Sequence, residues 1–338
     1  MIRKKLFSIN VELTNKCPLR CPQCYCSLNG DKHIDIDLAK RKIQEAAEHG
    51  VSVVNLSGGE TLCYPWLYEL ILFASKRCEY VNIAISGCYF NEAVLHNLIE
   101  AGVTMISVSL NGSTKEINSI TRDGYDLAIK ALKVLRNNNH IQTCINWVMH
   151  STNSDDFPNI VKIAESFNVP LIDVIMFKPD SQNELNSYPT GIQMKQIADF
   201  IHNYRGPVNI QVESCFSPLL ALICNYSWLG NFNTSERKGC GAGIYMYNIN
   251  VDGFYSPCRH LDHFENYDTL DEYFEKSEFI RRVQRFESDL REPCASCSLE
   301  RYCRPCVAIT NKLCGGEFKG HNPCQVWQLN ESPLPKTR

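Results

Sequence analysis

Short apolar runs alternate with amphipathic segments through the first half of the chain. Six of these runs are rich in Val, Ile and Leu and show little strict alternation with polar residues, which is typical of parallel strands buried on both faces. They predict strands over residues 8–14, 51–57, 81–86, 105–110, 143–149 and 171–177.

The segments between these runs have a helical period. They predict helices over residues 35–49, 66–76, 91–100, 125–137 and 155–167. In residues 125–137 the apolar positions 127, 128, 131, 132 and 135 lie on one helical face. Several residues are suited to begin or end these helices, namely Asp35 or Asp37, Asn91 and Asp155 as N-caps and Gly50 and Gly102 at C-termini.

Strand and helix alternate six times, which predicts an α/β fold with a parallel sheet. Six βα units are too few to close an eight-stranded barrel, so we expect a partial (βα)6 TIM-like barrel. A doubly wound sheet is the alternative. In either architecture the loops at the carboxyl ends of the strands carry the functional site.

The alternation fades after about residue 185. A helix over 191–204 and a strand over 208–213 precede an irregular, cysteine-rich region with frequent glycine turns and one expected helix over 270–286. This region lacks the apolar mass for a core of its own, so we expect bound metal to hold it together. We predict a barrel domain over 1–210, a bridging region over 211–237, a small Cys-rich domain over 238–330 and a tail over 331–338.

The composition restricts the class of protein. The 338 residues carry a formal net charge of −3, and no basic cluster lies beside an apolar helix, so neither nucleic acid nor a membrane is an expected partner. The apolar run near the N-terminus is short and contains Asn10 and Glu12, unlike a signal peptide. We therefore expect a cytoplasmic protein, in which the 18 cysteines are metal ligands or catalytic groups rather than disulfides.

Three cysteines follow the first predicted strand with the spacing C-x3-C-x2-C, namely Cys17, Cys21 and Cys24. Three thiolates on one loop can bind three irons of a 4Fe–4S cluster and leave the fourth iron open, as a catalytic site requires. The alternative is a structural zinc site with Cys26 as the fourth ligand. Residues 57–60, Ser-Gly-Gly-Glu, end the second predicted strand, and their glycines would let the backbone approach a ligand closely.

Together these motifs resemble those of radical S-adenosylmethionine (SAM) enzymes, and the resemblance covers residues 8 to about 180. It implies that the three cysteines bind the cluster and that a flavodoxin- or ferredoxin-type reductant supports reductive cleavage of SAM. The resulting 5′-deoxyadenosyl radical abstracts a hydrogen atom from the substrate. The resemblance also implies a set of SAM-binding groups: Gly58, Gly59 and Glu60 for the amino group, Ser109 and Arg122 for the carboxylate, and the backbone of 174–176 for the adenine. The sequence departs from the family at Gln23, where an aromatic residue is usual, and at Ser86, where an Asn is frequent.

The cysteines after residue 239 resemble the SPASM extension of radical SAM enzymes, which carries up to two auxiliary 4Fe–4S clusters. The family pattern implies two ligand sets, namely Cys294, Cys297, Cys303 and Cys324 for one cluster, and Cys240, Cys258 and Cys306 for the inner one. Cys303 and Cys306 are separated by two residues where three are usual, and Met246 stands where some members have a fourth ligand. The inner cluster is therefore completed by Cys314 or left open to a substrate thiolate. A pair of zinc sites is the alternative.

Most SPASM enzymes act on peptides or proteins, so the resemblance implies a maturase of a ribosomally synthesised peptide. Thioether formation and epimerisation are both compatible with the sequence. The alternatives are a formylglycine-forming protein maturase, a small-molecule enzyme and an iron–sulfur electron carrier. Formylglycine formation is disfavoured because Arg259, and not an Asp, follows Cys258. Arg259 and His260 are either a solvated pair or the partners of a peptide carboxylate or carbonyl. The chain begins close to the first strand, so we expect a separate leader-peptide-binding protein as a partner, or capture of the peptide at the barrel mouth.

Cys215 is the candidate hydrogen-atom donor of an epimerase, because it follows the strand predicted over 208–213 and a thiol can quench a Cα radical. The alternative is a buried cysteine that acts as a small apolar side chain. Burial in the core is also the expectation for the other cysteines outside the two clusters, which are Cys63, Cys78, Cys88, Cys144 and Cys224.

Overall fold

The computed structural model describes residues 6–26, 30–179, 184, 187–216, 219, 223, 239–289, 292, 294–296 and 303–313. Four of the cysteines discussed above lie outside these described residues, namely Cys224, Cys297, Cys314 and Cys324. The tail predicted over 331–338 lies outside them as well.

Within the described residues, one sheet of nine strands forms the centre of the molecule, with the order β7-β6-β5-β4-β3-β2-β1-β8-β9. Strands β1 to β8 run parallel to their neighbours, and β9 is antiparallel to β8. Their bounds are β1 Ser8–Glu12, β2 Val53–Ser57, β3 Tyr80–Ile85, β4 Met105–Ser109, β5 Gln142–Met149, β6 Leu171–Met176, β7 Asn209–Val212, β8 Met246–Ile249 and β9 Tyr255–Ser256.

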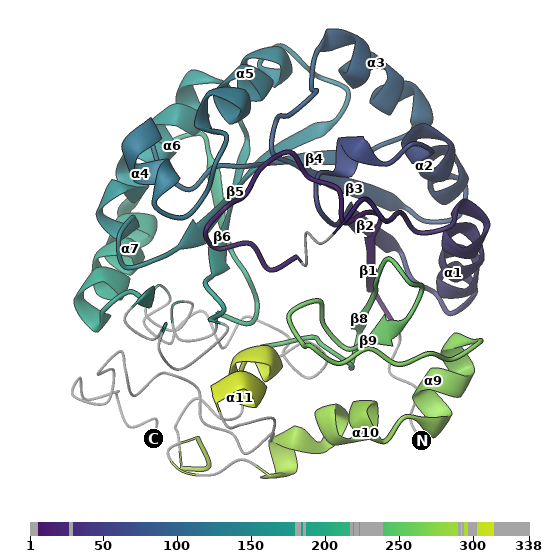
Figure 1. Ribbon diagram of the computed structural model, residues 1–338. Coiled ribbons are helices and arrows are strands. Elements are labelled where there is room, and N and C mark those ends of the chain that lie inside the picture. The colour runs from purple at the N-terminus through teal and green to yellow at the C-terminus, as the bar shows by residue number, and fades with distance from the viewer. Residues whose placement is uncertain are drawn as a thin grey trace.

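The helices that connect the strands line the outside of the curved sheet, which leaves the strands on the inside of an open barrel (Figure 1). These helices are α1 Ile36–Glu48, α2 Leu67–Ser75, α3 Glu92–Ala101, α4 Lys115–Ser119, α5 Tyr125–Leu135, α6 Phe157–Ser166 and α7 Gly191–Asn203. The α/β prediction of a partial barrel is confirmed. The doubly wound alternative, which needs helices on both faces of the sheet, is not the fold of this chain.

The expected caps are found at two of the three helix starts. Asp35 accepts a hydrogen bond from Leu38 N at the start of α1, and Asn91 accepts one from Val94 N at the start of α3. The Asp155 prediction is wrong, because Asp155 lies inside the 3-10 turn η2 Ser154–Asp156. Asp156 precedes α6, and its carboxylate accepts instead from Ser113 N and Ser113 Oγ, both at 2.6 Å.

The helix predicted over 270–286 is broken into two, α9 Leu270–Lys276 and α10 Glu278–Arg285. Ser277 interrupts it with an extended backbone (φ −66°, ψ 119°) and caps α10 by accepting from Ile280 N. A serine followed by an acidic first turn is the usual signature of a helix start, so the break has a local sequence cause. The remaining described helical segments are η1 Thr61–Cys63, η5 Phe286–Asp289 and α11 Val307–Leu313.

The later part of the chain joins the barrel through main-chain pairing. Strand β8 pairs in parallel with β1, from Ser8 opposite Met246 to Val11 opposite Ile249. The predicted boundary between a barrel domain and a Cys-rich domain stays a prediction, but β8 continues the sheet of the earlier segment.

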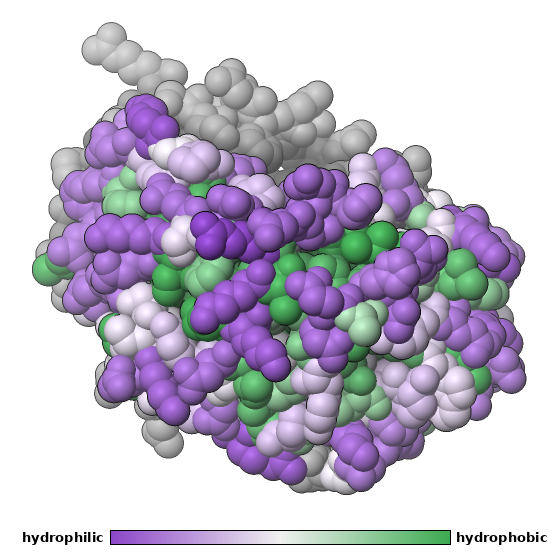
Figure 2. All heavy atoms as spheres, turned by 90° about the horizontal axis from the view of Figure 1, so that it is seen from above, coloured by the Kyte–Doolittle hydropathy of each residue, from purple (hydrophilic) through white to green (hydrophobic). Residues whose placement is uncertain are grey.

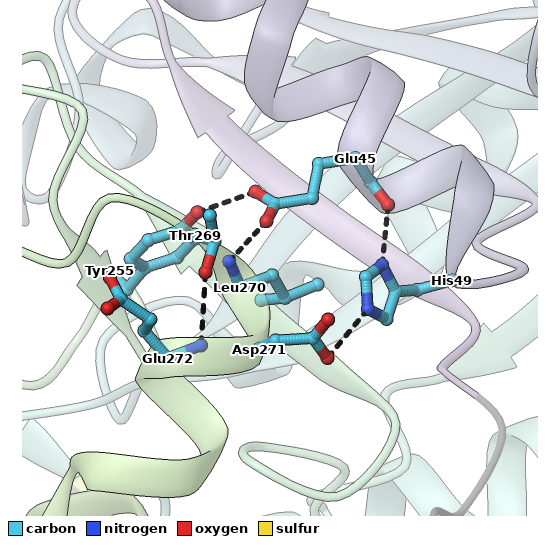
Figure 3. A network of polar contacts seen from close by, with 7 residues as sticks. All are labelled: Glu45, His49, Tyr255, Thr269, Leu270, Asp271 and Glu272. Atoms are coloured by element: carbon cyan, nitrogen blue, oxygen red, sulfur yellow. Dashed lines mark hydrogen bonds and ion pairs between the residues drawn. The ribbon is translucent and has the colours of Figure 1, made fainter.

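A polar network also fastens the later segment to helix α1 (Figure 3). Glu45 of α1 accepts from Leu270 N with one carboxylate oxygen and from the Tyr255 hydroxyl, at 2.8 Å, with the other. One turn further along α1, His49 bonds Glu45 O at 2.8 Å and the Asp271 carboxylate at 3.1 Å. The start of α9 is therefore held at two points on α1.

Seen from above, over the helices that cover the barrel, the surface is mostly hydrophilic with apolar side chains showing between the polar ones (Figure 2). In the part of the chain that the structure describes, no helix combines the length and the apolar character needed to cross a membrane.

Candidate active site

The cysteine loop follows β1 at the carboxyl edge of the sheet and crosses the opening framed by the strands (Figure 1). Two contacts fix it to residues 121–123, which follow α4. Arg20 N donates to the Asp123 carboxylate at 2.9 Å, and Gln23 N donates to Thr121 O at 3.3 Å. The Arg20 guanidinium closes the loop on itself by donating to Cys17 O at 2.6 Å.

The two glycines of the Ser-Gly-Gly-Glu turn lie directly on the backbone of this loop. Gly59 N donates to Thr14 O at 2.7 Å, and Glu60 N donates to Lys16 O at 2.8 Å. A Cβ atom at Gly58 would stand 2.6 Å from Thr14 O, and one at Gly59 would stand 2.4 Å from Lys16 O. Glycine is required here because backbone packs on backbone, in addition to the close approach to a ligand that we expected.

The four thiols of the loop differ in electrostatic environment. A hydrogen bond from Cys26 lowers the pKa of Cys24 to about 6, whereas burial raises the pKa of Cys17 to about 11. Burial also raises the pKa of Cys21, against the opposing charge of Arg122. Cys26 lies 2.9 Å from Gly58 O and serves as a hydrogen-bond donor.

The three thiols of the C-x3-C-x2-C motif fit a multi-iron cluster. Among the described residues, no three His, Cys, Asp or Glu side chains converge closely enough to hold a single metal ion. Zinc needs all its ligands at once, with sulfur about 2.3 Å from one ion. A 4Fe–4S cluster binds each thiolate to a different iron, so its ligands stand further apart. Three half-buried thiols on one loop suit the second arrangement.

Glu60 is almost fully buried at the end of β2 and is tightly oriented. One carboxylate oxygen accepts from Ser86 N at 2.9 Å and from Ser86 Oγ, and the other accepts from Leu62 N at 3.2 Å. Burial raises the pKa of Glu60, although these bonds and the charge of Arg122 oppose the shift. Ser86, which stands where the family often has Asn, therefore supplies two donors that hold this carboxylate.

Arg122 lies close enough to Cys21, Cys24 and Glu60 for its charge to act on all three: it opposes the raised pKa of Cys21 and of Glu60 and adds to the lowering of the pKa of Cys24. Its Nε atom is buried and has no hydrogen-bond partner among the described residues. An uncompensated guanidinium donor beside the cysteine loop is suited to bind a ligand carboxylate.

The remaining expected SAM contacts lie at the same edge. Ser109 is the last residue of β4 and stands opposite Asn146 of β5. At the end of β6, Val174 O accepts from Glu213 N at 3.0 Å, and Met176 N donates to the Glu213 carboxylate at 3.2 Å. The structure thus brings Glu60, Arg122 and the cysteine loop together, and Ser109 and residues 174–176 lie at the same edge of the sheet, at the ends of β4 and β6.

Three cysteines of the later segment are buried together, namely Cys240, Cys258 and Cys306. The Cys306 and Cys240 thiols lie close enough to affect each other's pKa, and burial together with the nearby Cys240 raises the pKa of Cys258. Cys215 is also buried, and its thiol lies close enough to the Cys306 thiol for each to affect the pKa of the other. Cys294 and Cys303 are half-buried. The other expected ligands of their cluster lie outside the described residues.

A buried arginine orders the backbone around this group. Arg304 donates to Ala242 O at 3.0 Å and to Val283 O at 2.7 Å, and also to Cys240 O. Cys240 N in turn donates to Arg304 O at 2.9 Å. This network fixes the backbone at Cys240 and next to Cys306. The sequence alone did not predict it.

The Arg259 side chain is half-buried and is hydrogen-bonded to three residues of the barrel. Its guanidinium donates to the Tyr25 hydroxyl at 3.0 Å, to Ser57 Oγ at 3.3 Å and to Asn10 Oδ1 at 2.9 Å. The neighbouring His260 ring lies 4.9 Å from the Tyr25 ring, centroid to centroid. Arg259 therefore connects the later segment to β1, β2 and the cysteine loop.

The remaining described cysteines mostly behave as core residues. Cys78, Cys88 and Cys144 are buried, and Cys63 is half-buried. This agrees with the expectation that they act as small apolar side chains.

The fold and the site fit the radical SAM class that the cysteine and Gly-Gly-Glu motifs predicted. The family model of the Radical SAM superfamily matches residues 11–164, which carry these motifs. The family implies a 4Fe–4S cluster and SAM, which the thiols, the glycine-lined turn and the unpaired Arg122 donor fit.

Individual proteins with known descriptions resemble the chain over most of its length. A PqqA peptide cyclase from Rhodopseudomonas palustris is 26% identical over 316 residues, which are 87% of this chain and 79% of the relative. The crystal structure of Streptococcus suis SuiB bound to the precursor peptide SuiA aligns with a TM-score of 0.76 at 16% identity, over 95% of this chain and 76% of SuiB. The structure of anSMEcpe with bound AdoMet aligns with a TM-score of 0.75 at 16% identity, over 95% of this chain and 94% of that one. At such identity the two structures show a shared fold.

Proposed function

We propose that this protein is a radical SAM maturase that modifies a ribosomally synthesised peptide. The observation that carries the proposal is the convergence of the cysteine loop, the buried Glu60 and the unpaired Arg122 donor at one edge of the sheet. The similarity to a PqqA peptide cyclase over 87% of the chain supports a peptide as the substrate class.

When bound, the cluster and SAM supply a 5′-deoxyadenosyl radical that abstracts a hydrogen atom from the substrate. The chain positions these groups with its own residues. Cys17, Cys21 and Cys24 hold the cluster, and the Arg122 guanidinium pairs with the SAM carboxylate. Gly58 and Gly59 leave room at the turn that receives the SAM amino group, and Glu60 neutralises that group.

Ser86 contributes to SAM binding in this proposal by orienting the Glu60 carboxylate. Because two Ser86 donors fix one carboxylate oxygen and Leu62 N binds the other, Glu60 cannot rotate away from the strand edge. Ser109 and the backbone of 174–176 complete the SAM contacts in this proposal, from the ends of β4 and β6.

The product is either a cross-link, such as a thioether, or an epimerised residue. Epimerisation requires a hydrogen-atom donor, for which Cys215 is the sequence candidate, whereas a cross-link requires net loss of hydrogen from the peptide. Formylglycine formation gains no support from the geometry, because Arg259 follows Cys258 and is already bonded to Tyr25, Ser57 and Asn10.

Mass spectrometry of small peptides encoded beside the gene, each co-expressed with the enzyme in heavy water, tests the proposal. Loss of two hydrogens indicates a cross-link or another oxidation. Unchanged composition with one non-exchangeable deuterium indicates epimerisation. The matched control is the enzyme with Cys17, Cys21 and Cys24 all replaced by Ala, which should leave every peptide unmodified. Equal modification by this variant would contradict the proposal.

A further inference from the structure

Cys215 lies three residues beyond the end of β7, at the carboxyl edge of the sheet. Its side chain is 5% exposed. It precedes Phe216, which is fully buried. Cys215 is therefore enclosed in the molecule, and the residues around it decide what its thiol can do.

Its thiol belongs to a group of four. Cys240 N donates to Arg304 O at 2.9 Å, which places Cys240 beside the segment of Cys306. The Cys215 thiol lies close enough to Cys306, and Cys306 and Cys258 close enough to Cys240, for the thiols to affect each other's pKa. The four residues come from well-separated places in the sequence, and each is less than 9% exposed. Tertiary folding has thus brought four buried thiols together.

A buried cation lies beside this group. The Lys178 side chain is 5% exposed, and its ammonium lies 2.9 Å from the Glu213 carboxylate. Its positive charge also acts on Cys215, Cys258 and Cys306, where it opposes the raised pKa of each thiol. An ordinary apolar core offers no buried cation to thiols, whereas a set of thiolate ligands carries negative charge that such a cation stabilises.

A backbone donor is aimed at the same group. His260 N lies 3.5 Å from Cys258 Sγ. Hydrogen bonds from backbone N–H groups to ligand sulfurs are a common feature of iron–sulfur sites and help to set their potentials.

We propose that Cys215 is the fourth thiolate ligand of an iron–sulfur cluster whose other ligands are Cys240, Cys258 and Cys306. Four thiolates are the usual ligand set of a 4Fe–4S cluster. The sequence pattern supplies only three, because Met246 stands at the position of a possible fourth. Cys215 supplies the fourth thiolate. It lies before Cys240, outside the cysteine motif that resembles the SPASM extension.

The proposal has two consequences for chemistry. A cluster with four protein thiolates has no open iron for a substrate thiolate. A thiolate bound to iron also has no S–H hydrogen atom, so Cys215 does not quench a substrate radical. The proposal does not depend on the identity of the peptide, since the cluster can be examined without substrate.

The test uses the full-length chain with Cys17, Cys21 and Cys24 replaced by Ala, so that the N-terminal cluster contributes no signal. In this parent, Cys215→Ser is compared with Cys306→Ser, which changes an expected ligand, and with Cys144→Ser, which changes a buried cysteine of β5. Cys314→Ser tests the other candidate for the fourth ligand. The measurements, made after anaerobic reconstitution, are iron and sulfide per chain and low-temperature EPR before and after mild ferricyanide oxidation.

We expect Cys215→Ser to behave like Cys306→Ser. Each should either lose about four irons per chain, one cluster, or lose one iron on oxidation and show the EPR signal of a three-iron cluster. The parent, Cys144→Ser and Cys314→Ser should show neither change.

Iron content and spectra of Cys215→Ser that match those of Cys144→Ser would overturn the proposal. If such a variant also stopped D-residue formation in the complete enzyme, Cys215 would be the hydrogen-atom donor. The unsubstituted parent gives a second test that needs no change at position 215. A three-iron signal from the oxidised parent would mean that a cluster lacks its fourth protein thiolate, which contradicts the proposal.

Discussion

At the scale of single residues, two charged side chains beside the cysteine loop, Glu60 and Arg122, differ in how well their hydrogen-bonding groups are satisfied. Glu60 accepts three hydrogen bonds and is held in place, whereas the buried Nε of Arg122 has no partner among the described residues. A buried donor without a partner costs about 1–3 kcal/mol, so a carboxylate that binds there gains affinity by removing this cost.

Replacing Arg122 with Gln should therefore weaken SAM binding. A hydrogen bond to a charged group contributes about 1.5–3 kcal/mol, and every 1.4 kcal/mol is about tenfold in Kd. We expect the Kd for SAM to rise roughly tenfold to a hundredfold, measured by anaerobic equilibrium dialysis of the cluster-loaded protein. The control is Lys115→Gln, which removes an exposed cation that pairs with Asp126. Equal affinity for SAM in the Arg122 variant and in this control would contradict the assignment.

The sequence predicted some of these residues and not others. Cys17, Cys21, Cys24 and the Gly-Gly-Glu turn could be found because each motif is continuous in the sequence. The roles of Ser86 and Lys178, and the contact of Cys215 with Cys306, depend on tertiary contacts between distant segments. No spacing in one sequence encodes such contacts.

At the scale of elements, the hydrophobic pattern predicted all six central strands to within a few residues, because these strands are buried on both faces and read as continuous apolar runs. The break at Ser277 was missed, although its capping signature was visible. Strands β8 and β9 were also missed, because they are short and owe their place to pairing with β1 and with each other. The Asp155 cap was wrong because Asp155 lies inside the 3-10 turn η2 that precedes α6.

The contact between α1 and α9 should make stability depend on pH. Burial alone would lower the pKa of His49, but its bonds to Glu45 O and Asp271 raise it above the ordinary value of about 6.5. A raised pKa in the folded state means that the contribution is fully present below about pH 6.5 and is lost as the pH rises through the folded value.

Thermal unfolding of the wild type and of His49→Gln, followed from pH 5.5 to pH 8, measures this contribution. We expect the wild-type midpoint to exceed that of His49→Gln most at the acidic end, with a smaller difference at the alkaline end. The difference isolates His49 from other histidines such as His33 and His150, whose pKa values burial lowers. A difference between the two proteins that stays constant across this range would show that the ion pair with Asp271 does not form.

At the scale of the whole molecule, the later segment is fastened to the barrel at several places. It adds β8 beside β1, docks α9 on α1, and sends Arg259 across to Tyr25 in the cysteine loop. The expected clusters of the two regions are thus connected by hydrogen-bonded protein rather than by a free linker in the described part of the chain. Three clusters at four irons each would bring the fully loaded chain to about twelve irons.

The central claim is that the cysteine loop, Glu60 and Arg122 form a site for reductive SAM cleavage. The most direct test is to incubate the anaerobically reconstituted protein with SAM and dithionite and to measure 5′-deoxyadenosine by chromatography. We predict that the wild type forms 5′-deoxyadenosine and that the variant with Cys17, Cys21 and Cys24 replaced by Ala forms none, while the latter keeps the iron of the later segment. No 5′-deoxyadenosine from fully loaded wild type, or an equal amount from this variant, would contradict the claim.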